Sequence, residues 1–161
     1  MDLAKKLKWD QRWFQLVDLV ASWSKDPSTQ VGAVIIPDGG DCPVIGWNGF
    51  PRGVKDLPER YADRDTKYMM VTHAEANSIL NAARNGVNLR GSTIYISHPP
   101  CNECSKLIVQ SGIKKVIHRP LPDEIKERWG KLLKYSDLIL SEGGVITEIY
   151  EIEKEETHTQ S

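Results

Sequence analysis

The amino-acid sequence predicts a three-layer α/β fold: one mixed sheet of five strands with helices on both faces. Short apolar runs alternate with longer stretches in which apolar residues recur every three to four positions, a pattern typical of strands alternating with amphipathic helices. Strands separated by complete helices favour parallel pairing, whereas a short turn between the first two strands favours an antiparallel hairpin. The length of 161 residues fits one domain, expected over residues 1–152.

The first half of the chain is expected to contain one helix and a β-hairpin. The helix runs from Asp10 to Lys25 and ends before Pro27. Its apolar side chains recur at helical spacing: Trp9, Trp13, Leu16, Val17, Val20 and Trp23. The hairpin strands are Val31 to Ile36 and Val44 to Trp47, with Pro, Asp and Gly between them. The polar segment from Asn48 to Lys67 is expected to be a loop without secondary structure that binds a ligand, with a solvated surface loop as the alternative.

The second half is expected to alternate helices with strands. The expected helices, each stopped by a glycine, are His73 to Asn85, Cys101 to Ser111 and Asp123 to Ser141. The expected strands are Thr93 to Ser97, Lys115 to His118 and Val145 to Ile152. The polar tail from Glu153 to Ser161 is expected to be loose.

The composition narrows the classes of partner. The formal net charge is −1, without the basic excess of most nucleic-acid binders, so a small substrate is expected rather than a polymer. No apolar run is long enough to span a membrane and no secretory signal is visible, so no membrane partner is expected. The three cysteines, two of them in one C-x-x-C pair, indicate a reducing compartment: the cytoplasm, or the host cytoplasm if the protein is viral.

Two short motifs carry the candidate chemistry, and each is expected to open a helix. The first is His73-x-Glu75; the second is Cys101 with Cys104 one turn later, preceded by Pro100. Helix starts carry free N–H groups and partial positive charge, which favour the metal-binding thiolate. One imidazole and two thiolates suit Zn²⁺, one per chain, and leave its fourth position open, as in catalytic sites. Glu75 is then placed to transfer protons as general acid and base.

The two motifs together are more specific than either one. A lone C-x-x-C pair also occurs in redox sites and structural zinc sites. The combination H-x-E followed by P-C-x-x-C is the signature of zinc nucleobase deaminases. The alternative from another class is a zinc-stabilised binding module without turnover. That alternative needs a fourth protein ligand, for which the candidate side chains besides carboxylates are Cys42, His98 and His118.

Longer blocks extend the pattern: Ser24–Ala33, Gly46–Gly53, Lys67-Tyr68, Val71–Asn77, Gly91–Tyr95 and Cys101–Lys114. In these blocks the chain resembles the deoxycytidylate (dCMP) deaminases of the zinc-dependent cytidine/deoxycytidylate deaminase family. The resemblance implies a cytidine-deaminase-like αβα fold and hydrolysis of dCMP to dUMP and ammonia, which supplies dUMP for dTTP synthesis. Related deaminases that act on a cytosine nucleoside, a riboflavin precursor or a tRNA adenosine share the zinc motif and remain alternatives.

The resemblance also implies which residues contact nucleotides. Asn48 would contact the deoxyribose, Ser24 and Lys25 the 5′-phosphate, and the backbone at Ala74 the pyrimidine edge. A homohexamer activated by dCTP with Mg²⁺ and inhibited by dTTP is implied as well. The effector site near a subunit boundary would contain Phe50, Pro51, Arg52, Gly53, Asn77 and Arg84. Lysine can meet a phosphate as a point charge, and arginine can bind a triphosphate with two parallel hydrogen bonds.

The sequence departs from the family pattern at one expected position. Many relatives place a tyrosine shortly after the strand that follows the zinc helix, where it stacks on the base. Here the segment from His118 to Pro122 contains none. Some relatives also carry a structural zinc near the hairpin, but Cys42 has no nearby Cys or His. His98 is interpreted as a surface residue, with the pocket mouth as the alternative.

Overall fold

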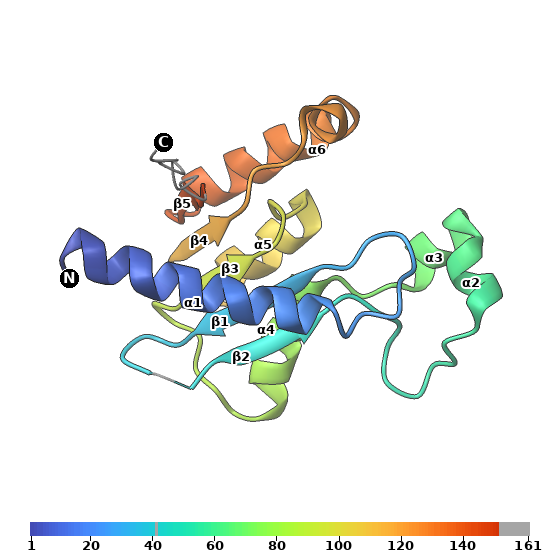
Figure 1. The fold of residues 1–161 in the computed structure, drawn as a ribbon, viewed down its shortest axis with the longest axis horizontal. Coiled ribbons are helices and arrows are strands. Elements are labelled where there is room, and N and C mark those ends of the chain that lie inside the picture. The colour runs from blue at the N-terminus through green and yellow to red at the C-terminus, as the bar shows by residue number, and fades with distance from the viewer. Residues whose placement is uncertain (41, 152–161) are drawn as a thin grey trace, which may run out of the picture.

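A computed structural model of the chain describes residues 1–40 and 42–151, and its centre is one sheet in the strand order β2-β1-β3-β4-β5 (Figure 1). The strands are β1 (Gly32–Ile36), β2 (Val44–Trp47), β3 (Thr93–Ile96), β4 (Lys115–His118) and β5 (Ile146–Ile149). β1 pairs antiparallel with β2 and β3, whereas β3, β4 and β5 pair parallel. The predicted mixed sheet of five strands is confirmed, including its antiparallel hairpin.

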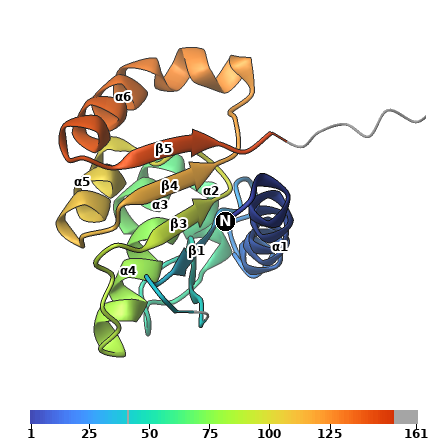
Figure 2. The same cartoon turned by 90° about the vertical axis from the view of Figure 1, so that its left-hand side faces the viewer.

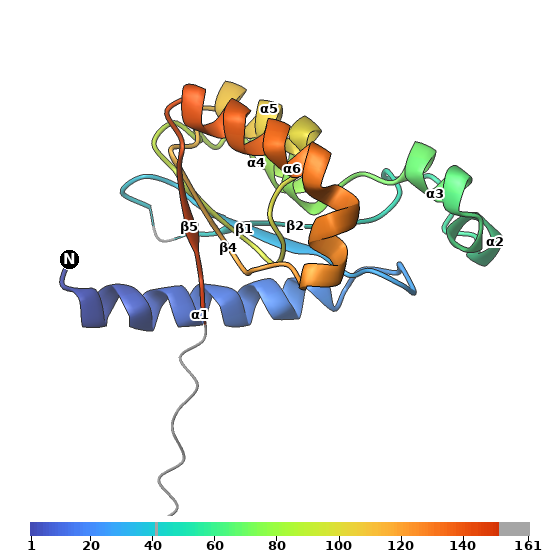
Figure 3. The ribbon, with the colours of Figure 1, turned by 90° about the horizontal axis from the view of Figure 1, so that it is seen from above.

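Helices cover both faces of the sheet, as predicted (Figure 2). Helix α1 (Leu3–Ala21) lies on one face. The opposite face carries α4 (Ala74–Arg84), α5 (Asn102–Gln110) and α6 (Asp123–Glu142). Seen from above, the sheet lies between α1 and the other three helices (Figure 3).

Each face of the sheet has its own apolar core because strand side chains alternate between the faces. Ile94 and Ile96 of β3 point to the α4–α6 face, where they share a buried cluster with Ile108 of α5. Tyr95, between them, points to the other face and contacts Phe14 of α1 at a ring-centroid distance of 5.6 Å. Burial of a large apolar side chain stabilises by about 1.5–3 kcal/mol, so both faces hold helices firmly.

The helix predicted over 10–25 is shifted toward the N-terminus. It begins at Leu3 because the Asp2 carboxylate accepts a hydrogen bond from the Lys5 N–H at 2.9 Å and so caps the helix. Its first turns are largely exposed, so no apolar periodicity marks them in the sequence. It ends at Ala21.

The segment 48–67, predicted to lack secondary structure, contains one short helix and most of a second. They are α2 (Pro58–Ala62) and α3 (Arg64–Met70), and Asp63 caps α3 by accepting from the Thr66 N–H at 3.0 Å. Each of these helices spans fewer than two turns, too few for the recurring apolar spacing that predicts a helix. Both lie beyond one end of the sheet (Figures 1 and 3).

The other elements agree with prediction to within one residue at each end, except the last strand. β5 ends at Ile149, where its ladder with β4 ends, rather than at Ile152. Ile152 and the predicted tail 153–161 lie outside the described residues. Within residues 1–40 and 42–151, no helix combines the length and apolar character needed to cross a membrane.

Candidate active site

Three helix starts meet at one edge of the sheet. β2 and β3 both run antiparallel to β1, which lies between them, and β4 runs parallel to β3. The carboxyl ends of β2, β3 and β4 therefore share one edge. α5 and α6 follow β3 and β4 directly and so begin at that edge. α4 follows β2 after α2 and α3, and a β-bridge between Gly49 and Thr72 brings its start back to the end of β2. In open α/β sheets, ligands bind outside the carboxyl ends of the strands.

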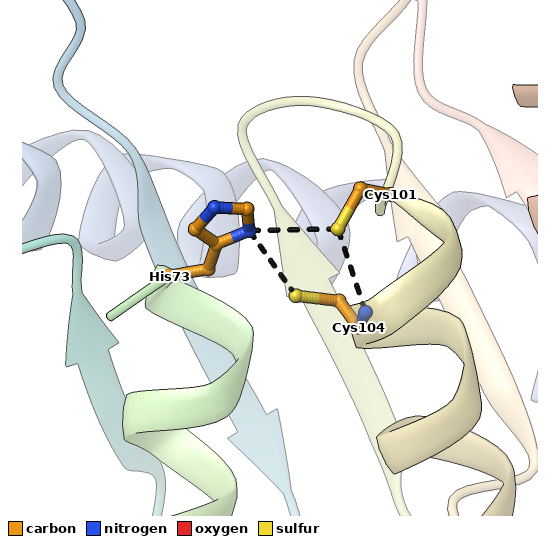
Figure 4. A group of neighbouring side chains, drawn as sticks. All are labelled: His73, Cys101 and Cys104. Atoms are coloured by element: carbon orange, nitrogen blue, oxygen red, sulfur yellow. Dashed lines mark hydrogen bonds between the residues drawn. The ribbon is translucent and has the colours of Figure 1, made fainter. Parts of the chain in front are cut away.

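The two sequence motifs meet at this edge (Figure 4). His73 and Cys101 are the N-cap residues of α4 and α5, and Cys104 lies in the first turn of α5. The His73 Nδ1 atom lies 3.5 Å from the Sγ atoms of both cysteines. The three candidate ligand atoms all lie within 4.8 Å of one another.

This group of three fits a zinc ion. Zn–S bonds of about 2.3 Å and Zn–N bonds of about 2.0–2.1 Å at tetrahedral angles place nitrogen and sulfur about 3.5–3.6 Å apart. The observed separations of 3.5 Å match that spacing. Among the described residues the group contains neither His98, His118 nor Cys42, the fourth ligands that a closed structural site would need. The donor set therefore suits zinc with one open position.

The electrostatics favour a thiolate in this group. Hydrogen bonds from the Cys104 thiol, from His73 and from the Cys104 N–H lower the pKa of Cys101 to about 4, against the opposing effect of burial. The backbone bond is 3.5 Å long. The thiolate is the form of cysteine that binds metal, so the fold prepares at least one sulfur for binding.

Glu75 lies in the first turn of α4 and is only 4% exposed. Burial raises the pKa of this carboxyl group to about 7, although its own backbone N–H and the neighbouring His73 act in the opposite direction. A carboxyl group that titrates near neutral pH can both accept and donate a proton under physiological conditions.

A cavity of about 200 Å³ opens beside this group, and His73, Glu75 and Cys101 line it. The other walls come from the ends of the first two strands, from the α3–α4 segment, and from the chain after β3 and β4. Their residues are Asp26, Thr29, Val31, Asn48, Lys67, Tyr68, Val71, Ala74, His98, Pro99, Leu121, Ile125, Arg128 and Trp129. An apolar cavity with a few convergent polar groups is typical of a small-molecule site.

Comparison with known proteins shows to which family the chain belongs. Residues 7–119 match the family model of the cytidine and deoxycytidylate deaminase zinc-binding region. The chain belongs to the cytidine and deoxycytidylate deaminase family. It is 44% identical over 138 residues to an uncharacterized deaminase in the luxG 3′ region of Aliivibrio fischeri, covering 86% of this chain and 90% of that protein.

Two further relatives have names that state their substrate, dCMP. Human deoxycytidylate deaminase is 45% identical over 116 residues, which cover 69% of this chain and 64% of the human protein, so the match spans less than two thirds of that enzyme. The crystal structure of dCMP deaminase from cyanophage S-TIM5, in complex with dCMP and dUMP, superimposes with a TM-score of 0.70 at 26% identity. It covers 93% of this chain and 99% of that one.

Of the four predicted substrate contacts, two line the cavity: Asn48 and Ala74. The Asn48 side chain is held rigidly: its Oδ1 accepts from the Val31 N–H and its Nδ2 donates to the Thr29 carbonyl, both at 2.8 Å. These contacts join the ends of β1 and β2. The structure therefore uses Asn48 to shape the cavity wall, and its predicted contact with a sugar stays a prediction.

The other two predicted substrate contacts, Ser24 and Lys25, do not line the cavity. The Ser24 hydroxyl is buried and donates to the Asn48 carbonyl at 2.8 Å. The Lys25 ammonium is 2.7 Å from the Asp56 carboxylate and points to solvent, with its side chain 69% exposed. Ser24 thus supports the wall from behind, whereas Lys25 lies outside it in this structure.

The predicted effector residues gather beside α4. Arg52, in the turn that contains Pro51 and Gly53, donates to the Asn81 Oδ1 at 2.8 Å. Asn77, Asn81 and Arg84 lie on one face of α4, at helical spacing, and Arg84 is exposed. The Phe50 ring stacks on Tyr61 with ring centroids 4.2 Å apart. The structure therefore brings most of these residues to one side of the hairpin, away from the cavity lining.

Several charged or aromatic cavity residues, among them Asp26, Lys67, His98, Arg128 and Trp129, have no substrate role predicted from the sequence. Asp26 and Lys67 form an ion pair of 3.2 Å in the wall. His98 lines the cavity, which favours the pocket-mouth alternative over a simple surface position. Arg128 and Trp129 come from α6. Lys67 lies in one of the blocks that resemble dCMP deaminases, so the sequence offered a signal for it. The sequence around Arg128 and Trp129 offers none, because only the packing of α6 brings these two residues to the cavity.

Proposed function

We propose that this protein hydrolyses dCMP to dUMP and ammonia. The observation that carries the proposal is the three-ligand group of His73, Cys101 and Cys104 with the buried Glu75 beside it, at the edge of a largely apolar cavity. The same residue types form the active site of zinc deaminases, in which the glutamate is not a zinc ligand. The similarity to the human and cyanophage dCMP deaminases favours dCMP over the other substrates of the family.

The residues of the chain have distinct roles in this reaction. His73, Cys101 and Cys104 would hold a zinc ion, and zinc bound there would lower the pKa of a water molecule enough to supply hydroxide near neutral pH. The Glu75 carboxylate would take one proton from the attacking water and deliver it to ring nitrogen N3, and would then move the remaining proton of the added hydroxyl group to the leaving amine. The products are then dUMP and ammonia, with one water consumed. The raised pKa of Glu75 suits both proton transfers.

Recognition of the nucleotide is proposed to follow the cavity walls. Asn48 contacts the deoxyribose, the backbone at Ala74 contacts the pyrimidine edge, and Ser24 and Lys25 act on the 5′-phosphate side. Asn48 and Ala74 are supported by their place in the lining. For Ser24 and Lys25 the support is the sequence resemblance alone, and Lys25 would have to leave Asp56 to reach a ligand.

Ammonia release from purified zinc-loaded protein tests the function. dCMP, deoxycytidine, cytosine, a riboflavin precursor and an RNA hairpin are supplied separately, and dCMP is expected to be the preferred substrate. Preference for any of the others would reject the substrate assignment. Glu75→Ala is the matched variant: it is expected to keep zinc and the fold but lose turnover. Loss of zinc in that variant would instead identify Glu75 as a ligand and reject the mechanism.

We further propose that the enzyme is a cytoplasmic homohexamer that supplies dUMP for dTTP synthesis, activated by dCTP with Mg²⁺ and inhibited by dTTP. Cys42, Cys101 and Cys104 form no disulfide within the described residues, which is compatible with a reducing compartment. The effector contacts are Phe50, Pro51, Arg52, Gly53, Asn77 and Arg84, whose grouping beside α4 supports one site. Arg84→Ala is expected to weaken both effector responses while basal turnover persists. Equal loss of basal turnover would reject the assignment, and the mass in solution with and without dCTP tests the hexamer.

A further inference from the structure

The first turns of α6 form a wall of the cavity that the reaction does not yet explain. Ile125, Arg128 and Trp129 line it, and their spacing of i, i+3 and i+4 places them on one face of the helix. Leu121, just before the helix, is buried in the same wall. One face of α6 therefore places an arginine and neighbouring apolar side chains in the cavity wall.

The position of α6 relative to the metal group is fixed by buried hydrogen bonds. The Ser136 hydroxyl, 2% exposed, donates to the Pro100 carbonyl at 2.8 Å, directly before Cys101. It also lies 2.7 Å from the Ser105 hydroxyl of α5. Arg128 lies about two helical turns before Ser136 on the same helix. The helix that carries the arginine is thus tied to the loop that carries a candidate zinc ligand.

The two cationic side chains of the cavity differ in what they already bind. Lys67 lies 3.2 Å from the buried Asp26 carboxylate and donates to the Ser28 hydroxyl at 2.8 Å, and its side chain is only 12% exposed. Arg128 is exposed and takes part in none of the ion pairs or side-chain hydrogen bonds within residues 1–40 and 42–151. The cavity therefore has one cation neutralised within its wall and one that remains available to an anionic ligand.

We propose that Arg128 binds the 5′-phosphate of the nucleotide and so makes the enzyme select a nucleotide over a nucleoside. The inference rests on the proposed deamination of dCMP and makes Arg128 the main phosphate contact, on a side where Lys25 is supported by sequence resemblance alone. A guanidinium group forms two parallel hydrogen bonds with phosphate, which a lysine cannot copy. Ile125 and Trp129 line the cavity beside Arg128.

The test compares substrates that differ only in the phosphate. With Arg128→Ala, KM for dCMP is expected to rise about 10- to 100-fold, the loss of one charge-assisted contact, with little change in kcat. Turnover of deoxycytidine, which has no phosphate, is expected to stay at the wild-type value. Arg128→Lys should restore part of the dCMP affinity. Lys131→Ala, on the same helix but outside the cavity lining, is the matched control and should leave KM and kcat unchanged for both substrates.

Binding of dUMP and deoxyuridine, measured by calorimetry on the zinc-loaded proteins, gives a readout independent of turnover. Arg128→Ala is expected to weaken dUMP binding and leave deoxyuridine binding unchanged, with a thermal midpoint near that of wild type. Equal loss of both ligands, no loss of either, or a phosphate-selective loss in Lys25→Ala alone would overturn the inference. If the wild-type protein releases no ammonia from dCMP, the proposed function fails, and the dUMP comparison still decides the role of Arg128.

Discussion

Gly46 in β2 allows the sheet to approach closely to α4, the helix at whose start His73 and Glu75 lie. A Cβ atom added at this position would lie 2.4 Å from the Ser78 nitrogen and 2.5 Å from the Ala74 carbonyl oxygen. These two atoms are four residues apart in α4, where they form the two ends of a helical hydrogen bond. Gly46→Ala would therefore push a methyl group into the backbone of α4 rather than against a movable side chain.

The size of the effect follows from these distances. Ordinary contacts lie at 3.4–4 Å, so α4 must move away by about 1 Å. Overpacking typically destabilises the fold by about 1–3 kcal/mol. Because the added methyl group would press the backbone of β2 against the backbone of α4, we expect a loss of ~3 kcal/mol for Gly46→Ala. For a protein of this size that loss lowers the melting temperature by about 6–12 °C. Since α4 also carries His73 and Glu75, a shift of this size should reduce kcat by about 100-fold.

Gly49→Ala is the matched control because a Cβ atom there meets no heavy atom within 4 Å. Thermal unfolding at one protein concentration and ammonia release from dCMP are measured for both variants, each loaded with zinc. Gly49→Ala should match wild type in both. Wild-type stability in Gly46→Ala would refute the close packing of β2 on α4. A destabilised variant with full kcat would show that the site does not depend on the position of α4.

The remaining predictions concern the metal group and the cavity wall. Glu75→Gln should keep zinc, by metal analysis, and lower kcat by about 10²–10⁴-fold, and full activity would contradict proton transfer by Glu75. Cys104→Ser should lose zinc and melt at the temperature of the chelator-treated wild type; retained zinc would exclude Cys104 as a ligand. Burial raises the pKa of Asp26, but hydrogen bonds from Ser28, Thr29 and Lys67 outweigh it and lower that pKa. Its stabilisation is therefore complete above pH ~4 and lost as pH falls further, so Asp26→Asn should be less stable at pH 7 and show a weaker acid dependence in denaturant melts.

The metal group was predictable from the sequence because its parts are local. Cys101 and Cys104 are one turn apart, and Pro100 and His73 precede stretches with helical periodicity, so the helix starts could be inferred from neighbours in the chain. The crossovers of a mixed α/β fold then bring such starts to one edge of the sheet. Local signals were enough to predict this part of the fold.

The cavity walls were less predictable because they depend on packing between distant segments. Nothing near Arg128 or Trp129 indicates that one face of α6 points to the metal group; the hydrogen bond from Ser136 to Pro100 joins residues far apart in sequence. The same holds for Lys25, which seemed suited to phosphate by charge but pairs with Asp56 on a segment predicted to be a loop. Charge indicates which ligand a residue could bind, whereas tertiary contacts decide whether it is available.

The helix starts at the shared edge also explain why a side chain is needed for phosphate selectivity. Each helix start carries roughly half a positive charge, which favours the Cys101 thiolate and any anion near it. This effect falls off within the first turn of a helix, and the first turns of α4 and α5 hold the metal group itself. Their fields therefore act on the reacting end of a nucleotide. Discrimination between dCMP and deoxycytidine requires a charge at the other end of the ligand, and an arginine on α6 can supply it at a fixed distance from the metal group because Ser136 ties that helix to Pro100.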